Sequence, residues 1–244
     1  MRRTVTAKLE PNGAMSARIS EHSVGQAAVS ERSLHTRKTT DEYRKTIESW
    51  ISGNIVAASI ARLDCRDDVD SNQFQLDLEV TTPKYAQLMQ NRLLVFRPAL
   101  LSRREAVTFM EGVRHYPIEI EPEGFEEQSE IALPEGFAVD ELPDRVKLES
   151  AFGTYDSAVE TDGKVLKIHR RLSLKPMFLV AEKYPEVKSF FDRISAAEQA
   201  PAVLLRKQQT SGEEQFSPTD GSGTLIRNPG EGSENYERLL WSNC

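Results

Sequence analysis

Alternating apolar and polar positions predict β-strands along most of the first 207 residues. Phe74, Leu76, Leu78 and Val80 alternate with polar residues, which is the period of a strand with one buried face. Similar patterns predict strands at 4–9, 14–19, 55–63, 93–96, 116–121, 131–133, 137–142, 146–148, 157–161, 164–174 and 202–206, with a weaker one at 25–34.

Turn residues connect several of these patterns into hairpins. Pro11-Asn12-Gly13 separates the first two strands, and Asp162-Gly163 separates two strands near the end of the patterned region. Asn-Gly and Asp-Gly favour tight hairpins because these residues readily adopt positive φ. Neighbouring strands are therefore expected to pair antiparallel.

Two segments have the apolar spacing of amphipathic helices. Thr39 and Glu42 form a capping-box pattern before a helix that would bury Tyr43, Ile47, Trp50 and Ile51, and Gly53 would end it. Pro185 suits the first position of a second helix, with Val187, Phe190, Phe191 and Ile194 on its apolar face and Pro201 beyond its end. Residues 100–112 fit helix and strand equally well.

These elements predict a mainly β fold, an antiparallel β-sandwich with two amphipathic helices over sheet edges or ends. One domain over residues 1–207 is the first interpretation, and a division into two subdomains near 112–130 is the alternative. Residues 208–244 are rich in Ser, Gly, Glu, Thr and Pro, so we expect a disordered C-terminal tail.

The charge balance argues against nucleic acid as a partner. The chain of 244 residues carries a formal net charge of −7, and nonspecific binding to phosphates needs clustered Lys and Arg. The pairs Arg103-Arg104 and Arg170-Arg171 are too small to reverse that balance. Acidic residues between Glu119 and Glu149 mostly alternate with apolar ones, which favours a solvated sheet face over a cation-binding patch.

The order of short motifs between residues 131 and 207 resembles a known family. The motifs are Leu-Pro-x-Gly-Phe at 133–137, Asp-Glu-Leu-Pro at 140–143, Phe-Gly-x-Tyr at 152–155, the Asp-Gly hairpin, Arg-Arg-Leu at 170–172, Lys-Tyr-Pro-Glu-Val at 183–187, Phe-Phe at 190–191 and Val-Leu-Leu at 203–205. This order is similar to the C-terminal region of bacterial transglutaminase-like proteins, in which a papain-like core lies between two β-rich domains of unknown function.

The resemblance extends upstream, to roughly residue 5. Glu42-Tyr43-Arg44-Lys45, the segment 85–96 and Arg114 before Tyr116-Pro117 look like the region that follows the core in that family. The resemblance implies a non-catalytic accessory domain that packs beside a transglutaminase-like core or presents a protein or peptide to it. It also implies that this chain is a fragment lacking the core, and that the chain is not an enzyme.

One cysteine invites a catalytic interpretation. Asp64-Cys65-Arg66-Asp67 is superficially similar to the Asp-Cys-Lys-Asp context of the nucleophile in the family's core, and His115 is the nearest downstream histidine. A thiol nucleophile needs a lowered pKa and a paired base, whereas the neighbouring carboxylates would raise the pKa of Cys65. A Cys65–His115 enzyme is therefore the least favoured hypothesis, and no catalytic residue is predicted.

An acidic loop resembles part of a calcium-binding loop. Asp68, Asp70 and Asn72 occupy positions 1, 3 and 5 of an EF-hand-like pattern, and Glu79 falls at position 12. Position 6 is Gln73, where the turn needs Gly, and Glu79 belongs to a strand pattern. A polar loop between strands is the favoured interpretation.

No other cofactor or metal site is predicted. His22, His35, His115 and His169 lack metal-ligand spacing, and no phosphate-binding or nucleophile-elbow motif occurs. Most aromatic residues fall on predicted core faces, and exposed aromatics near Tyr85, Phe125 or Tyr155 would be the exception.

The sequence says little about location. No apolar run reaches the ~20 residues of a membrane span. The first eight residues lack the apolar segment of a signal peptide, although the resemblance implies a parent protein of the bacterial cell envelope or periplasm.

Two functions from different classes thus follow from the sequence. An accessory domain predicts an apolar interface patch for a neighbouring core. A stand-alone peptide- or glycan-binding module of the cell envelope predicts a concave site with exposed aromatics.

Overall fold

The computed structural model describes residues 1–102 and 112–207. The described residues belong to one compact unit. The predicted tail at 208–244, Arg103-Arg104 and most of the ambiguous segment 100–112 lie outside the described residues.

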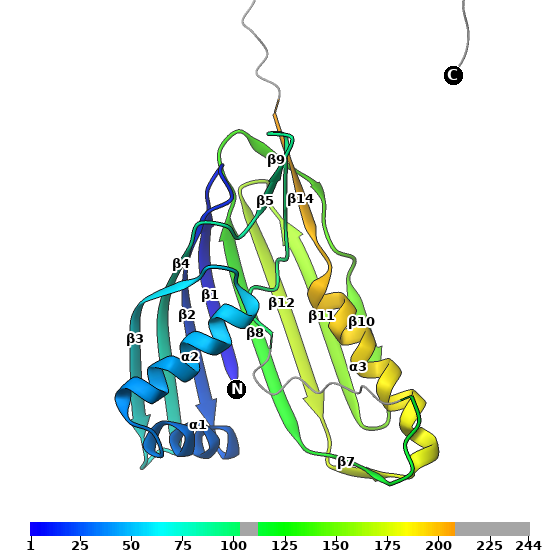
Figure 1. Ribbon diagram of the computed structural model, residues 1–244. Coiled ribbons are helices and arrows are strands. Elements are labelled where there is room, and N and C mark those ends of the chain that lie inside the picture. The colour runs from blue at the N-terminus through cyan, green and yellow to red at the C-terminus, as the bar shows by residue number, and fades with distance from the viewer. Residues whose placement is uncertain (103–111, 208–244) are drawn as a thin grey trace, which may run out of the picture. The chain divides into compact units, whose positions relative to one another are not determined.

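An eight-stranded sheet dominates the described chain (Figure 1). Its strand order is β10-β11-β12-β8-β1-β2-β4-β3. The strands are β1 (Arg2–Leu9), β2 (Met15–Val24), β3 (Ser59–Asp68), β4 (Gln73–Thr82), β8 (Glu123–Ala132), β10 (Val146–Glu149), β11 (Gly153–Thr161) and β12 (Val165–Leu174). Adjacent strands are antiparallel except for β1 and β8, which are parallel. The mainly β fold class is confirmed.

Two smaller sheets complete the strand structure. A four-stranded sheet has the order β5-β6-β14-β9, with β5 (Gln87–Met89), β6 (Leu93–Phe96), β14 (Ala202–Arg206) and β9 (Phe137–Glu141). A two-stranded sheet pairs β7 (Ile118–Ile120) with β13 (Met177–Leu179). The last predicted strand, 202–206, matches β14.

Both predicted helices are present, and a third helix corrects the prediction for 25–34. Thr39 caps α2 (Thr40–Asn54) with the predicted capping box, and α3 spans Tyr184–Gln199 after a short 3₁₀ turn at Ala181–Lys183. Residues 26–36 form α1 (Gln26–Thr36) where a strand was predicted. Gly25, at φ 60°, turns the chain after β2. The side chain of Ala28 is buried, so α1 packs against the rest of the fold through this residue.

Several strand boundaries differ from the predicted ones. β2 continues to Val24 beyond the predicted 14–19, β8 spans Glu123–Ala132 where 131–133 was predicted, and β11 begins at Gly153 instead of 157. The strand predicted at 55–63 begins later and runs longer, as β3, because 55–58 form the connection out of α2. Trp50, predicted to be buried, is half-buried, whereas Tyr43, Ile47 and Ile51 are buried as predicted.

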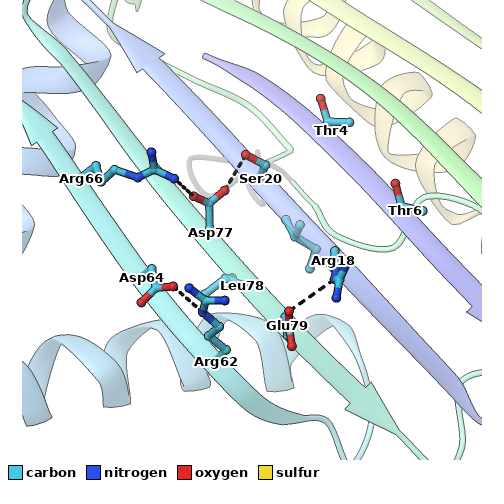
Figure 2. Close-up of a pocket in the computed structure, with 11 residues that line it drawn as sticks. Thr4, Thr6, Arg18, Ser20, Arg62, Asp64, Arg66, Asp77, Leu78 and Glu79 are labelled. Carbon is cyan, nitrogen blue, oxygen red and sulfur yellow. Dashed lines mark hydrogen bonds and ion pairs between the residues drawn. The ribbon is translucent and has the colours of Figure 1, made fainter.

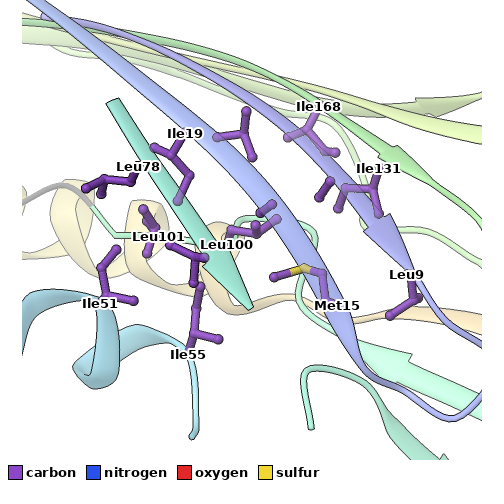
Figure 3. Packing of buried hydrophobic residues seen from close by; sticks show 14 of the residues in the cluster. Leu9, Met15, Ile19, Ile51, Ile55, Leu78, Leu100, Leu101, Ile131 and Ile168 are labelled. Atoms are coloured by element: carbon purple, nitrogen blue, oxygen red, sulfur yellow. The ribbon is translucent and has the colours of Figure 1, made fainter. Parts of the chain in front are cut away.

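Buried side chains fall into two clusters. The first joins α1, α2 and the four-stranded sheet to β1, β2 and β4, and it includes Leu9, Met15, Ile19, Ile51 and Leu101 (Figure 3). The second joins α3 and the β7–β13 sheet to β8 and β10–β12. Burial of these apolar faces is the main driving force for the fold.

Candidate functional site

Cys65 and His115 occupy different parts of the fold. Cys65 is half-buried on β3, the terminal strand of the large sheet, and its Sγ lies 3.7 Å from the Tyr43 hydroxyl on α2. His115 is exposed on the segment before β7, which packs in the second cluster. Cys65 thus contacts Tyr43 of α2 and pairs with Leu76 of β4, whereas His115 belongs to the segment before β7.

The residues with an EF-hand-like spacing are spread along a hairpin. Asp68 ends β3, and Asp70 and Asn72 belong to the turn into β4. The turn is held by protein contacts, since Asp68 Oδ1 accepts from Ser71 N and Asn72 Oδ1 accepts from Arg32. Glu79 lies six residues along β4 from the turn, about 20 Å at ~3.3 Å per residue, and it pairs with Arg18.

The remaining histidines and aromatics serve local packing and pairing. His22 contacts Gln73, and His35 packs against Tyr43 and Phe74. His169 is partly exposed between Glu126 and Asp156, at 3.8 and 4.0 Å. Phe125 and Tyr155 are buried and Tyr85 is half-buried, so these three aromatics do not form an exposed platform.

Four charged side chains form a row across the buried face of the large sheet. Arg3 lies opposite Glu21 in the β1–β2 pairing and opposite Glu127 in the β1–β8 pairing, and Arg170 lies opposite Glu127 in the β12–β8 pairing. The order Glu21, Arg3, Glu127, Arg170 alternates in sign, and each side chain is at most 3% exposed. We refer to these four residues as the buried charge row.

Short ion pairs hold the buried charge row together. Arg3 Nε lies 2.7 Å from Glu21 Oε1, and Arg3 Nη1 lies 3.0 Å from Glu127 Oε2. Arg170 Nη2 donates to Glu127 Oε2 at 2.6 Å. Glu198 on α3 lies 3.1 Å from Arg170 Nη1, so the row contacts α3 as well as the sheet.

The buried charge row also fixes backbone where the chain leaves β6. Arg3 Nη1 and Arg170 Nη2 donate to the Leu101 carbonyl at 3.2 and 2.8 Å. The Arg3 guanidinium lies 5.4 Å from the Trp50 ring centroid and 5.3 Å from that of Phe125, which are cation–π distances. Trp50 packs with the first cluster and Phe125 with the second, so the row lies where the two clusters meet.

Opposite charges control ionisation in this row. Burial by itself raises the pKa of the Glu127 carboxyl, but the positive charges of Arg170 and Arg3 outweigh burial and hold that pKa below its usual range. Burial by itself lowers the pKa of the Arg170 guanidinium, and the carboxylates of Glu127 and Glu198 raise it above its usual value. Glu127 and Arg170 therefore stay charged at neutral pH.

The buried charge row is absent from the predictions, although its pattern is visible in the sequence. Arg3 is in phase with Val5 on β1, and Arg170 is in phase with Ile168 and Leu172 on β12. A charged residue in phase with the core positions of a strand is the sequence signal that could have revealed the row. The solvated face predicted for 119–149 is corrected at Glu127, which is buried, and Arg170 and Arg171 point to opposite faces.

The opposite face of the sheet carries a shallow polar groove of about 330 Å³ over β1–β4. Figure 2 shows the charged residues of this outer-face charge array: Arg18, Arg62, Asp64, Arg66, Asp77 and Glu79. Arg18 pairs with Glu79 at 3.3 Å, Arg66 with Asp77 at 3.6 Å, and Arg62 with Asp64. Because three cations match three anions, the groove has little net charge to offer a ligand.

Four large exposed apolar side chains lie on β13 or on the segments next to β7 and β13. Val113 and Tyr116 precede β7, Phe178 lies on β13 and Val180 follows it, with exposed fractions of 69%, 78%, 76% and 60%. Within the described residues they make up four of the nine large exposed apolar side chains. We refer to these four residues as the β7–β13 patch.

A sequence family matches part of this chain. Residues 91–204 match the family described as "Domain of Unknown Function with solved-structure structure (DUF3858)", which is a little under half of the chain. The matched range runs from β6 into β14, and it contains Glu127, Arg170 and the β7–β13 patch. No curated protein matches the sequence.

One solved structure is similar to part of this chain. It is described as a "putative protease" from Parabacteroides distasonis, with 11% sequence identity and a TM-score of 0.42. The similar region covers 48% of this chain and 24% of that chain, so this chain corresponds to only a minor part of that protein. None of the described helices is long and apolar enough to cross a membrane.

Proposed function

We propose that this chain is a non-catalytic accessory domain that binds another protein domain through the β7–β13 patch. The partner implied by the sequence resemblance is a transglutaminase-like core, the papain-like domain beside which similar β-rich regions occur. The match to a domain family of unknown function over residues 91–204 supports the domain character of this region. The observation that carries the proposal is the exposure of the four apolar side chains of the β7–β13 patch, which lie on β13 or next to β7 and β13.

The patch has the composition of an interface centre. Tyr116 and Phe178 are more than three-quarters exposed, and aromatic side chains each bury about 150–250 Å² when covered. Aromatic residues are enriched among the few side chains that dominate binding energy at interfaces. Ile118 and Ile120 on the other side of β7 are buried in the second cluster, which gives the exposed side chains a fixed support.

Binding to a separately produced transglutaminase-like core tests this proposal. The core should come from a bacterial protein that carries the same terminal region, and isothermal titration calorimetry should measure its affinity for the full chain. Phe178→Ser and Tyr116→Ser should each weaken binding by about tenfold or more, since a central aromatic contributes roughly 2 kcal/mol or more.

Val69→Ser is the matched control because Val69 is 65% exposed at the β3–β4 turn, outside the β7–β13 patch. It should leave the affinity unchanged. Absence of binding at millimolar concentration, or equal effects of Phe178→Ser and Val69→Ser, would contradict the proposal.

A further inference from the structure

A second groove lies beside the edge strand of the four-stranded sheet. It has a volume of about 640 Å³ and runs along the segment leading into β5, the adjacent part of β6 and the end of α2. Its lining includes Val56, Lys84, Leu88, Val95, Arg97 and Pro201. We refer to it as the β5 groove.

The groove is positively charged on a negatively charged chain. Its lining includes Lys84 and Arg97 and no carboxylate, although the chain as a whole has a formal net charge of −7. Arg97 is half-buried, and Nη2 donates to the Asn54 carbonyl at 2.8 Å. Within the described ranges 1–102 and 112–207, no carboxylate forms an ion pair with Arg97.

This arrangement differs from that of the buried arginines. Arg3 and Arg170 each have carboxylate partners within 3.1 Å, which compensate for the loss of water around their charges. The guanidinium of Arg97 has a neutral carbonyl partner in the described structure, with further donor groups in a fixed planar fork. A carboxylate from a ligand would complete its coordination.

The floor of the groove is held in place by the first hairpin. The amides of Tyr85 and Ala86 donate to the Gly13 carbonyl at 2.8 and 3.0 Å. Gly13 has φ +88°, and a Cβ there would lie 2.2 Å from the Ala86 oxygen. The Tyr85 hydroxyl donates to the Arg97 carbonyl. These hydrogen bonds fix the backbone on both sides of the groove.

The groove extends over neighbouring strands of the four-stranded sheet. Its lining includes Leu88 of β5, Val95 of β6 and Pro201 just before β14. Apolar Val56, which is 69% exposed, lies in the same groove.

We propose that the β5 groove binds an extended acidic segment of another polypeptide, which lies in the groove and places a carboxylate on Arg97. This site is separate from the β7–β13 patch, so either proposal can fail alone. Arg97 and Lys84 select negative side chains, and Val56 and Leu88 offer apolar surface to the neighbouring side chains of the segment.

Fluorescence anisotropy on the full chain tests the site with labelled synthetic peptides. The probe alternates Val and Glu over about seven residues, a common strand length. A comparison peptide carries Lys in place of Glu. The acidic probe should bind, and the lysine peptide should bind at least about tenfold more weakly because its charge is reversed.

Substitutions locate the binding. Arg97→Gln should weaken binding of the acidic probe by about tenfold or more, and Lys84→Gln should weaken it less because Lys84 is exposed. Arg92→Gln is the matched control, since Arg92 is exposed on the β5–β6 turn and outside the groove. Thermal unfolding checks that each variant is folded, and Lys84→Gln decides the matter if Arg97→Gln is not.

Absence of binding by the acidic probe at millimolar concentration would overturn the proposal. Equal affinity for the acidic and lysine peptides would also overturn it, as would equal effects of Arg97→Gln and Arg92→Gln.

Discussion

The buried charge row and the outer-face charge array use the same residue types on neighbouring strands of one sheet. In the row, Arg3 and Glu127 are fully buried. In the array, Arg18 is 80% exposed and its partner Glu79 is 40% exposed at the side chain. Water solvates the second pair and not the first, so similar ion pairs contribute very differently to stability.

The contrast teaches what each array contributes to the fold. Removing one partner of a buried pair leaves an uncompensated charge in the interior, whereas an exposed charge that loses its partner remains hydrated. The buried charge row also holds the Leu101 carbonyl and α3 through Arg170. It therefore links elements, while the outer-face charge array covers a sheet surface.

The largest expected effect comes from Glu127→Gln, which removes the shared carboxylate of the row with little change in shape. Arg3 and Arg170 would both lose that negative charge, so the free energy of unfolding should fall by about 3–5 kcal/mol. Urea unfolding followed by circular dichroism measures the change. A loss below about 1 kcal/mol would place the row in the same class as the exposed pairs.

The second-largest expected effect is a loss of stability at acidic pH that depends on the buried charge row. The folded-state pKa of Glu127 is lowered, so its ionisation stabilises the fold above the usual glutamate pKa of about 4.3. That stability is lost as pH falls through the lower folded-state pKa. Unfolding curves from pH 5 downward should therefore fall more steeply for the parent chain than for Glu127→Gln. Parallel curves would show that Glu127 is not a source of acid sensitivity.

The smallest effect is expected for Glu79→Gln, which breaks the exposed pair with Arg18. The free energy of unfolding should change by less than about 1 kcal/mol. At about 1 M salt, where the Debye length is roughly 3 Å, even that difference should disappear, while the effect of Glu127→Gln should persist. A salt-resistant loss in Glu79→Gln would remove the distinction between the two faces.

Local sequence determined most of the strands and two helices. The alternation at 73–82, the Asp162-Gly163 turn and the Thr39 capping box each predict structure from neighbouring residues, and each is present. The segment 26–36 was mispredicted because a short mixed pattern does not separate strand from helix. Its helical state depends on packing against β2 and β4, which the local pattern does not encode.

The candidate sites could likewise be recognised only in part from the sequence. Arg3 and Arg170 could be recognised as charges in phase with core positions, but the sequence does not say which carboxylates meet them. Arg3 and Glu127 are 124 residues apart, and the parallel pairing of β1 with β8 brings them together. The lining of the β5 groove likewise comes from distant segments, including Val56, Arg97 and Pro201.

The sequence alone therefore determined the period, turns and caps of individual elements, because those depend on interactions between residues close along the chain. The tertiary structure decided which face of the sheet is buried and which carboxylates pair with Arg3 and Arg170 there. Those outcomes depend on burial and on distant neighbours, since the energy of a charge changes with its solvent and partners far more than with its position in a local pattern.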